Sequence, residues 1–322
     1  MKSLIAFLFV AAPIWAQVAT LTGRVTDPTG AIIPGARITA RSVDTGIEAA
    51  TATNNEGYFT LPSLQPGRFE VTFTKEGFVP LRQTGLALTV QQVARLDVTL
   101  QVGAVAETIE VQAQATLLDS ESSTVGQVIG NRQVTELPLL GRNTYALAML
   151  VPGVRPSFGV NNVVIDQIST VSYAINGQRA SANEFLLDGA PNSTSTQNQP
   201  VINANPDMVQ EFKVETNAFS AEYGRAAGGV FNVVTKSGTN DLHFTAYEFF
   251  RHEKLSANDF FANRSGVQKA PFRFNQFGGT LGGPVYIPKL YDGRNRTFFF
   301  FNTEFVRFNQ GITFTAAVPE AA

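Results

Sequence analysis

Three long, aromatic-rich runs near the end of the chain restrict its fold more than any other feature. They are LHFTAYEFFR (242–251), PFRFNQFGGTLGGPV (271–285) and RTFFFFNTEFVRF (296–308). A strand in the core of a soluble protein rarely carries so many aromatic side chains, whereas transmembrane barrel strands carry aromatic girdles at both interfaces. The runs therefore predict membrane-crossing strands. Because four consecutive phenylalanines (298–301) break the alternation, the pattern leaves the lipid-facing side of each strand open.

This segment is short for a membrane barrel. Residues 241–322 number 82 (322 − 240). A membrane-crossing strand takes about 9–11 residues besides its turns and outer loops, which leaves room for roughly three to five strands. The smallest single-chain barrels have about 8 strands, and barrels with a plugged lumen have about 22. We therefore expect these residues to form the first strands of an incomplete transmembrane β-barrel, as a short open sheet.

The N-terminus has the layout of a secretory signal peptide. Lys2 supplies a positive charge and residues 3–15 are almost wholly apolar, a run too short to span a bilayer. We predict a signal peptide over residues 1–16, cut after Ala16. The large Ile14 leaves the cleavage site open, and a buried first strand is the alternative. Cysteine is absent, which excludes disulfides, thiol nucleophiles and Cys-based zinc sites.

Residues 17–101 have the pattern of a β-sandwich. The turn signals DPTG, VDTG, NNEG and LQPG recur at short intervals. Between them, apolar and polar residues alternate, as expected for half-buried strands. The alternating apolar residues include Phe69, Val71, Phe73, Leu96, Val98 and Leu100. We predict a sandwich of about seven strands that folds as an independent domain.

Residues 115–240 change character and predict a small mixed α/β domain. A short helix is expected over Thr144–Leu150, ended by Pro152. Two strands with Asn-Gly and Asp-Gly turn signals are expected in TVSYAING (170–177) and EFLLDGAPN (184–192). Two further strands are expected in QEFKVET (210–216) and GVFNVVTKSG (229–238).

The composition and motifs argue against an enzyme and against nucleic-acid binding. In AFSAEYGRAAGGVFNVVTKSGTN (218–240), a strand-like run separates the glycines from Lys236, which does not fit the spacing of a phosphate-binding loop. The two histidines, His243 and His252, lie nine residues apart, and no G-x-S-x-G occurs. The net charge is −2, without the basic excess that nucleic acid requires. We expect no catalytic residues, no metal and no cofactor.

The segment GRVTDPTGAIIPGARITA…TATNNEGYFTLPSLQPGRFEVTFTKEGF (23–78) resembles the carboxypeptidase regulatory-like domain. The resemblance implies a transthyretin-like β-sandwich, which is also classed as carbohydrate-binding-like. It implies a fold rather than a ligand, and leaves carbohydrate binding open.

Five motifs occur in one order: LPLLGRN (137–143), PGV (152–154), INGQRASANEFLLDG (175–189), VQEFKVETNAFSAEYGRAAGGVFNVVTKSGTN (209–240) and NQFGGTLGGPV (275–285). Together they closely resemble the plug and first barrel strands of TonB-dependent outer-membrane receptors, in particular the Oar-like branch with a regulatory-like sandwich in front. The motif residues are Gly141, Arg142, Asn143, Asn176, Gly177, Asp188, Gly189, Glu211, Glu222, Tyr223, Gly224, Arg225, Gly229, Lys236, Ser237 and Gly238.

The resemblance implies a transporter that takes up a bulky extracellular substrate when a TonB-type energy-transducing protein pulls on the plug. It implies an outer-membrane location, contact with membrane lipid, and a periplasmic sandwich and linker (102–114). The substrate class stays open between oligosaccharide, peptide and siderophore. Receptors of this family pair with TonB through a short strand before the plug. Glu107, Thr108, Ile109, Glu110 and Val111 match it in position and type, with an ordinary linker strand as the alternative.

Within the plug, two kinds of residue are expected to meet the barrel wall. Gly224, Gly228 and Gly229 would let backbone approach backbone closely, because they lack a Cβ. Glu222, Arg225 and Lys236 are candidates for ion pairs with the wall, and solvated loop charges are the alternative. A secreted adhesin or carbohydrate-binding module is the alternative function, against which the aromatic runs argue.

Overall fold

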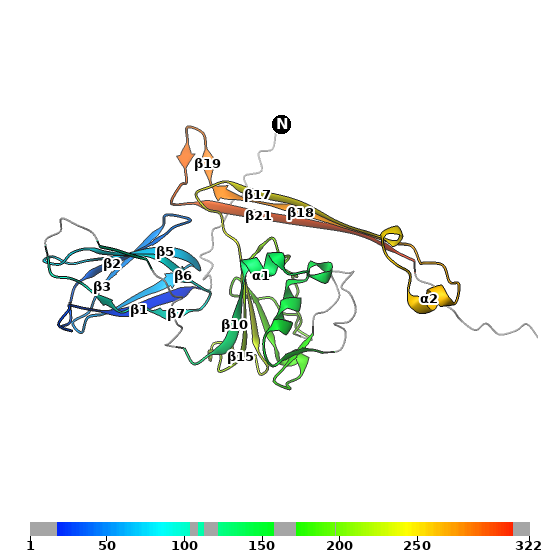
Figure 1. The fold of residues 1–322 in the computed structure, drawn as a ribbon, viewed down its shortest axis with the longest axis horizontal. Coiled ribbons are helices and arrows are strands. Elements are labelled where there is room, and N and C mark those ends of the chain that lie inside the picture. Colours follow the sequence, from blue (N-terminus) through cyan, green and yellow to red (C-terminus); the bar gives the residue numbers. More distant parts are fainter. Residues whose placement is uncertain (1–17, 104–108, 113–121, 158–171, 197, 312–322) are drawn as a thin grey trace, which may run out of the picture.

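The computed structural model describes residues 18–103, 109–112, 122–157, 172–196 and 198–311. Figure 1 shows a β-sandwich, a central α/β domain, and a long, thin sheet that lies across the central domain. Within the described part of the chain, no helix is long and apolar enough to cross a membrane. The predicted signal peptide lies outside the described residues.

The sandwich consists of two sheets that share one apolar core. One sheet has the order β4-β1-β7, and β8 also pairs with β1. The other has the order β3-β2-β5-β6-β9. The strands are β1 (Ala19–Thr26), β2 (Arg37–Ser42), β3 (Glu48–Ala52), β4 (Tyr58–Leu64), β5 (Gly67–Thr74), β6 (Leu81–Leu88), β7 (Val93–Arg95), β8 (Val98–Thr99) and β9 (Ile109–Gln112).

The predicted alternation defines this core. Phe69, Val71 and Phe73 of β5 are buried, and so are Leu96, Val98 and Leu100, while the residues between them on β5 are more exposed. The last glycine of each predicted turn has a positive φ, at 84° for Gly30 and 78° for Gly57, for example, which favours glycine. The predicted sandwich is therefore confirmed, with eight strands in place of seven before β9 is added.

The central domain has a five-stranded sheet in the order β10-β15-β16-β13-β14, covered on one face by helical turns (Figure 1). Ile129, Phe212 and Phe231 project from the sheet into a core that includes Tyr145. The elements are β10 (Val125–Gly130), α1 (Asn131–Glu136), η1 (Leu140–Arg142), η2 (Thr144–Leu150), β11 (Val154–Pro156), β12 (Tyr173–Ile175), η3 (Ala180–Ala182), β13 (Glu184–Leu187), β14 (Ala190–Pro191), β15 (Val209–Asn217) and β16 (Val230–Thr235). The predicted helix over Thr144–Leu150 is a 3₁₀ helix.

The three aromatic runs form one antiparallel sheet in the order β17-β18-β21, as predicted. Its strands are β17 (His243–His252), β18 (Phe272–Pro284) and β21 (Phe298–Gln310). The connection from β17 to β18 carries η4 (Glu253–Leu255) and α2 (Phe260–Arg264), and the connection from β18 to β21 carries β19 (Tyr286–Ile287) and β20 (Tyr291–Asp292). The two connections lie at opposite ends of the sheet (Figure 1).

The strand register resolves the two faces of this sheet. Residues directly opposite each other share a face, so Tyr247, Gly278 and Glu304 form one cross-strand row. This row faces the central domain, because Glu304 contacts Arg142 of that domain. The row Phe244, Leu281 and Phe301, three positions along the strands, is on the other face and is exposed. Since Phe301 is 59% exposed, the outward face supplies the apolar surface that a bilayer requires.

The first prediction concerns the sandwich. We expect residues 18–103 to unfold cooperatively on their own, because their core is closed within the domain. Phe73→Ala should lower the free energy of unfolding by about 3–5 kcal/mol, since Phe73 is fully buried. Thr60→Ala, at an exposed position of β4, should change it by less than about 0.5 kcal/mol. Urea unfolding followed by circular dichroism tests both, and a featureless spectrum of the wild-type fragment would contradict the prediction.

Candidate functional site

Arg142 joins the central domain to the long sheet. It lies in a tight turn with Gly141, and both have positive φ, 56° and 68°. Its side chain is only 12% exposed and pairs with Asp207 of the same domain, while its Nε lies 3.5 Å from Glu304 Oε2 on β21. The guanidinium carbon is 4.3 Å from the ring centroids of Tyr247 and Phe249 on β17. One cation therefore neutralises two carboxylates and covers two aromatic faces of the sheet.

Glu304 is held for this contact by its own sheet. Its Oε2 accepts a hydrogen bond from the Tyr247 hydroxyl and its Oε1 accepts one from Gln276 Nε2, both at 2.9 Å. A Cβ on Gly278 would lie 2.2 Å from the Thr303 carbonyl oxygen and 2.8 Å from the Tyr247 hydroxyl. Glycine is therefore the residue that lets Tyr247 reach Glu304 across β18. Tyr247 of β17 and Gln276 of β18 therefore hold the Glu304 carboxylate in position for its contact with Arg142.

A second polar contact lies beside the first. Asn205 of the central domain donates from Nδ2 to Oδ1 of Asn302 on β21 at 2.9 Å. Asn302 is two residues from Glu304, so both side chains emerge from the same face of the strand. The Arg142 contacts and this amide pair together form what we call the wall junction.

The chain passes from the central domain to the sheet at Gly238. A Cβ there would lie 2.3 Å from the Phe299 carbonyl oxygen and 2.6 Å from the Gly283 carbonyl oxygen, which are backbone atoms of β21 and β18. Within the described residues, Gly224, Gly228 and Gly229 do not closely approach β17, β18 or β21. A Cβ on Gly228 or Gly229 would meet Asn183, Ile175 and Glu215 of the central domain, and a Cβ on Gly224 would have its nearest neighbour at 3.9 Å.

The three charges expected at the wall do not pair with the described strands β17, β18 and β21. Glu222 and Arg225 are exposed, and within the described residues neither they nor Lys236 forms an ion pair with the long sheet. Lys236 is half-buried, and burial lowers its pKa although Asp207 opposes this effect. Sequence reasoning instead missed the pair Arg142–Glu304. Its signal was present in the LLGRN motif, where Arg142 follows a turn glycine.

Several predicted motif residues shape turns. Asn143 caps η2 by accepting the Tyr145 N–H at 3.0 Å. Asp188 and Gly189, both with positive φ, join β13 to β14, and the Asp188 carboxylate accepts hydrogen bonds from the N–H and hydroxyl of Thr235 at 2.8 Å. Asn176 and Gly177 form the corresponding turn after β12, where Asn176 Nδ2 donates to the Thr216 carbonyl at 2.9 Å.

The sandwich contacts the central domain at Glu211, which we call the sandwich junction. The Val90 N–H donates to Glu211 Oε1 at 2.5 Å, and the neighbouring Gln91 donates to the Tyr223 hydroxyl. Glu211 is 6% exposed. Burial raises its pKa to about 7, although the Val90 N–H and the Lys213 charge both oppose the rise. A carboxyl group that is hard to ionise therefore lies between the two domains.

The same face of the central sheet carries further buried polar groups. Lys213 and Glu215 of β15 form an ion pair at 3.0 Å, with side chains only 9% and 4% exposed. Asn232 of β16 is opposite Lys213 in the ladder and is fully buried. Its two side-chain polar atoms have no hydrogen-bond partner within the described residues. This face therefore retains buried polar groups that its own core does not satisfy.

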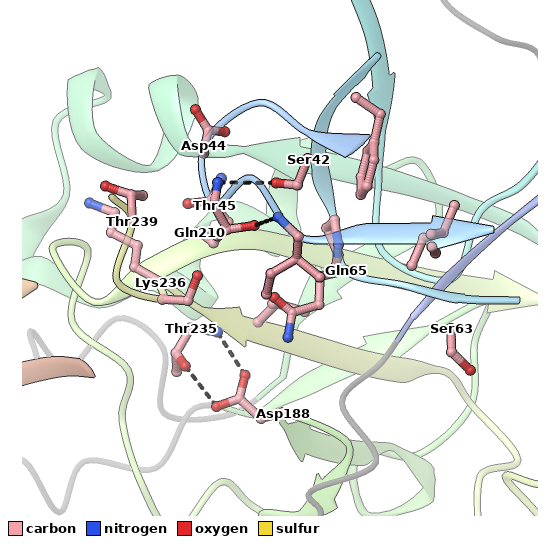
Figure 2. Close-up of a pocket in the computed structure, with 18 residues that line it drawn as sticks. Ser42, Asp44, Thr45, Ser63, Gln65, Asp188, Gln210, Thr235, Lys236 and Thr239 are labelled. Carbon is pink, nitrogen blue, oxygen red and sulfur yellow. Dashed lines mark hydrogen bonds between the residues drawn. The ribbon is translucent and has the colours of Figure 1, made fainter. Parts of the chain in front are cut away.

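A cavity of about 540 Å³ separates the sandwich from the central domain beside this junction. Figure 2 shows Ser42, Thr45 and Gln65 of the sandwich on one side, with Thr235 and Lys236 of the central domain on the other. Ser237 also lines it. The cavity removes close packing from part of the interface, so the two domains are held by the contacts at Glu211 and a few others.

The segment predicted to bind TonB is partly described. Ile109–Gln112 forms β9, which pairs in parallel with β6 at the edge of the sandwich. The Ile109 N–H donates to the Pro80 carbonyl at 3.0 Å. Ile109 and Val111 are 38% and 39% exposed. Ile109–Gln112 is therefore an edge strand of the sandwich, whereas Glu107 and Thr108 lie outside the described residues.

The histidines and acidic residues do not gather into one cluster in the described part of the chain. Within the described residues, no group of three or more His, Asp or Glu side chains could hold a metal ion. His252 lies 3.2 Å from Glu253 at the far end of β17, and His243 is at the opposite end of the same strand. The charged groups described above instead make contacts between domains.

Three family models match the chain in succession. Residues 20–101 match the carboxypeptidase regulatory-like domain, residues 118–230 the TonB-dependent receptor plug domain, and residues 234–322 an outer membrane β-barrel domain. The central domain is thus a plug, and the long sheet is part of a barrel wall. These domains place the chain in the outer membrane with the sandwich in the periplasm. The barrel match also argues against a secreted adhesin.

One curated relative aligns with most of the chain. The chain is 27% identical over 300 residues to the TonB-dependent transporter Oar of Myxococcus xanthus. The alignment covers 86% of this chain and 26% of the relative, so the chain spans about a quarter of the relative's length.

Solved structures show more distant similarity. The siderophore receptor PirA of Acinetobacter baumannii is 20% identical with a TM-score of 0.36, and PirA of Pseudomonas aeruginosa is 23% identical with a TM-score of 0.35. Each match covers 50% of this chain and 22% or 24% of the receptor. At these scores the two similarities do not define the fold.

The second prediction concerns Arg142. Arg142→Leu should leave Asp207 and Glu304 without their cation at a buried contact, at a cost of about 3–5 kcal/mol. All forms compared carry Asn205→Cys, which removes the amide pair with Asn302 equally from each. We expect the plug to leave the wall more often in Arg142→Leu, so that this thiol reacts faster with a soluble maleimide. Residues 1–322 contain no cysteine, so the labelling reports one site within them. Arg132→Leu, which breaks an exposed pair with Glu136, is the control, and equal labelling rates in the two variants would contradict the role of Arg142.

The third prediction concerns pH. Burial raises the pKa of Glu211 to about 7, and the sandwich contributes to that burial at the Val90 contact. The docked state then binds more protons than the separated state, so docking is strongest at low pH and weakens as pH rises through about 7. Lys213, Glu215 and Tyr223 are the charged or titratable groups nearby.

The measurement uses spin labels at Glu56→Cys in the sandwich and Asn198→Cys in the plug. We expect one narrow distance distribution at about pH 5.5 and a broader one at about pH 8.5. Glu211→Gln should keep the distribution narrow at both values, because the amide stays neutral. A pH response that survives this substitution would assign the effect to another group.

Proposed function

We propose that this chain is the N-terminal part of a TonB-dependent outer-membrane transporter, which takes up a bulky substrate by rearranging its plug. The observation that carries the proposal is the wall junction, where Arg142 of the plug meets Glu304 of the barrel wall. A plug tied to the wall by a few polar contacts closes a lumen at rest and can be moved without unfolding the barrel. The family matches and the Oar relative support the same function.

We divide the chain into a signal peptide (1–16), a regulatory-like sandwich (17–101), a linker (102–114), a plug (115–240) and barrel strands (241–322). The matched family segments support the three domain divisions. In this proposal the chain performs no covalent chemistry, and the energy for movement comes from its TonB-type partner. The substrate is a siderophore, peptide or oligosaccharide that binds from outside.

Blocking of the lumen can be tested without knowing the substrate. The receptor purified from outer membranes should conduct almost no ions in a planar bilayer. A variant that lacks plug residues 115–240 should form stable open channels, because the barrel wall alone leaves the lumen empty. If the deletion variant inserts and stays closed, the plug is not the barrier and the proposed function is wrong.

The partner contact is proposed at the edge of β9. A TonB-type protein adds one strand to Ile109–Gln112, and the sandwich presents the segment for this purpose. β6 occupies one edge of β9, and no described strand occupies the other. Successive residues of a strand direct their N–H and C=O groups to opposite edges. Because the Ile109 N–H points to β6, Glu110 and Gln112 face the open edge, where strand addition takes place.

The fourth prediction distinguishes a presented segment from one that must first detach. Glu110→Pro should abolish binding of the TonB-type periplasmic domain, because it removes a donor from the open edge. Glu110→Ala is the matched control and should bind normally. A disulfide between Gln83→Cys and Val111→Cys, which are opposite each other in the ladder, should keep binding intact if β9 is presented in place. Loss of binding in the oxidised form, with recovery on reduction, would show that β9 must leave β6.

A further inference from the structure

The connection between β18 and β21 is an ordered hairpin with an unusual surface. β19 and β20 pair at Tyr286↔Asp292 and Ile287↔Tyr291. The base is closed by hydrogen bonds of 2.9 Å from the Val285 N–H to the Thr297 carbonyl and from the Gly293 N–H to the Val285 carbonyl. The hairpin is therefore a defined structure that holds its side chains in fixed positions.

Its apolar side chains are exposed. Leu290 is 80% exposed and Tyr286 is 61% exposed, while Ile287 and Tyr291 are 46% and 38% exposed. Four large apolar residues within six positions form a patch that a soluble surface avoids. No described segment of the chain covers it.

The hairpin also carries positive charge. Lys289, Arg294 and Arg296 lie in or beside it, against the single acidic residue Asp292. Aromatic and aliphatic residues next to lysine and arginine are the composition that binds the interface of an anionic membrane. Tyrosine suits this depth, because its ring is apolar and its hydroxyl remains hydrated.

The position of the hairpin fits the same environment. It lies at the end of the sheet nearest the sandwich, which is the periplasmic end, and it projects from the side of the sheet opposite the plug (Figure 1). That side carries the exposed residues Phe244 and Phe301. The apolar patch therefore lies on the same side of the sheet as the exposed residues of the wall, and it extends outward from the wall (Figure 1).

The base of the hairpin is fixed to the rest of the protein. The Asn295 N–H donates to Asn240 Oδ1, and Asn240 Nδ2 donates to Asn295 Oδ1, both at 2.8 Å. The Asn240 N–H in turn donates to the Asp44 carbonyl of the sandwich at 3.1 Å. The same short link therefore orients the hairpin, the end of the plug and one sandwich loop.

We propose that the 285–297 hairpin is a membrane anchor that lies in the inner leaflet of the outer membrane, beside the barrel. Tyr286, Ile287, Leu290 and Tyr291 insert among the upper acyl chains, and Lys289, Arg294 and Arg296 bind phospholipid phosphates. The anchor fixes the height of the periplasmic end of the wall, and through Asn240 it fixes the position of the sandwich at the membrane surface. It depends on the outer-membrane location and not on transport.

A single-site fluorophore tests this proposal. An environment-sensitive NBD dye is attached at Leu290→Cys in the receptor, reconstituted into bilayers of phosphatidylethanolamine and phosphatidylglycerol. Residues 1–322 contain no natural cysteine, so any cysteine elsewhere in the receptor is replaced by serine first. The Leu290 side chain is 80% exposed, so its replacement removes little packing. Phe301→Cys on the lipid-facing wall is the positive control, and Glu56→Cys in an exposed sandwich turn is the aqueous control.

We expect the Leu290 probe to emit at shorter wavelength than the Glu56 probe and to lose fluorescence when doxyl-labelled lipids are included. The loss should be greater with the doxyl group near the headgroup than with the group at the chain end. A blue-shifted probe that doxyl lipids do not quench would show that a protein covers the hairpin. A probe that behaves like the one at Glu56 would show that the hairpin lies in water, and either result overturns the anchor.

Discussion

The contact of Arg142 with Glu304 is the interaction on which the arrangement of plug and wall depends. Side chains on a strand alternate between two faces, so one contact to β21 determines which side of all three barrel strands faces the lumen. The Arg142 guanidinium pairs with Asp207 of its own domain and Glu304 of the wall. Without it two carboxylates would oppose each other across the junction, and with it the plug has a defined seat.

The barrel strands could be predicted from sequence, whereas their faces could not. Long aromatic runs identify membrane strands because soluble cores rarely contain them. Yet Phe300 and Phe301 are consecutive and point to opposite faces, so aromatic content does not separate lipid from lumen. The two faces are distinguished by the plug, because Arg142 and Asn205 contact only one of them. The sandwich was easier to predict, because its strands share one core. The apolar residues of each alternating segment therefore all point into the same interior.

The site residues show why local sequence patterns predict turns but do not predict contacts between distant residues. A turn glycine such as Gly141 is visible in sequence, because left-handed backbone requires it. The partner of Arg142 is 162 residues away (304 − 142), and no local pattern relates the two. Glu222 and Arg225 attracted attention because they lie in a glycine-rich stretch, but their loop is exposed. The close approach to the wall occurs at Gly238 instead, where the backbone crosses between domains and leaves no space for a Cβ.

The two junctions of the plug differ in how they resist separation. At the wall, the carboxylate of Glu304 is held by Tyr247, Gln276 and Arg142, so separation removes several partners from a charge. At the sandwich, Glu211 is a carboxyl that burial makes hard to ionise, and the adjacent cavity lacks close packing. When the sandwich separates, hydration of the Glu211 carboxyl offsets part of the free energy lost with the contact. In the proposed mechanism, a pull on β9 reaches the plug through β10, an edge strand paired only with β15 among the described strands. The sandwich junction, on the same β15, therefore separates before the wall junction.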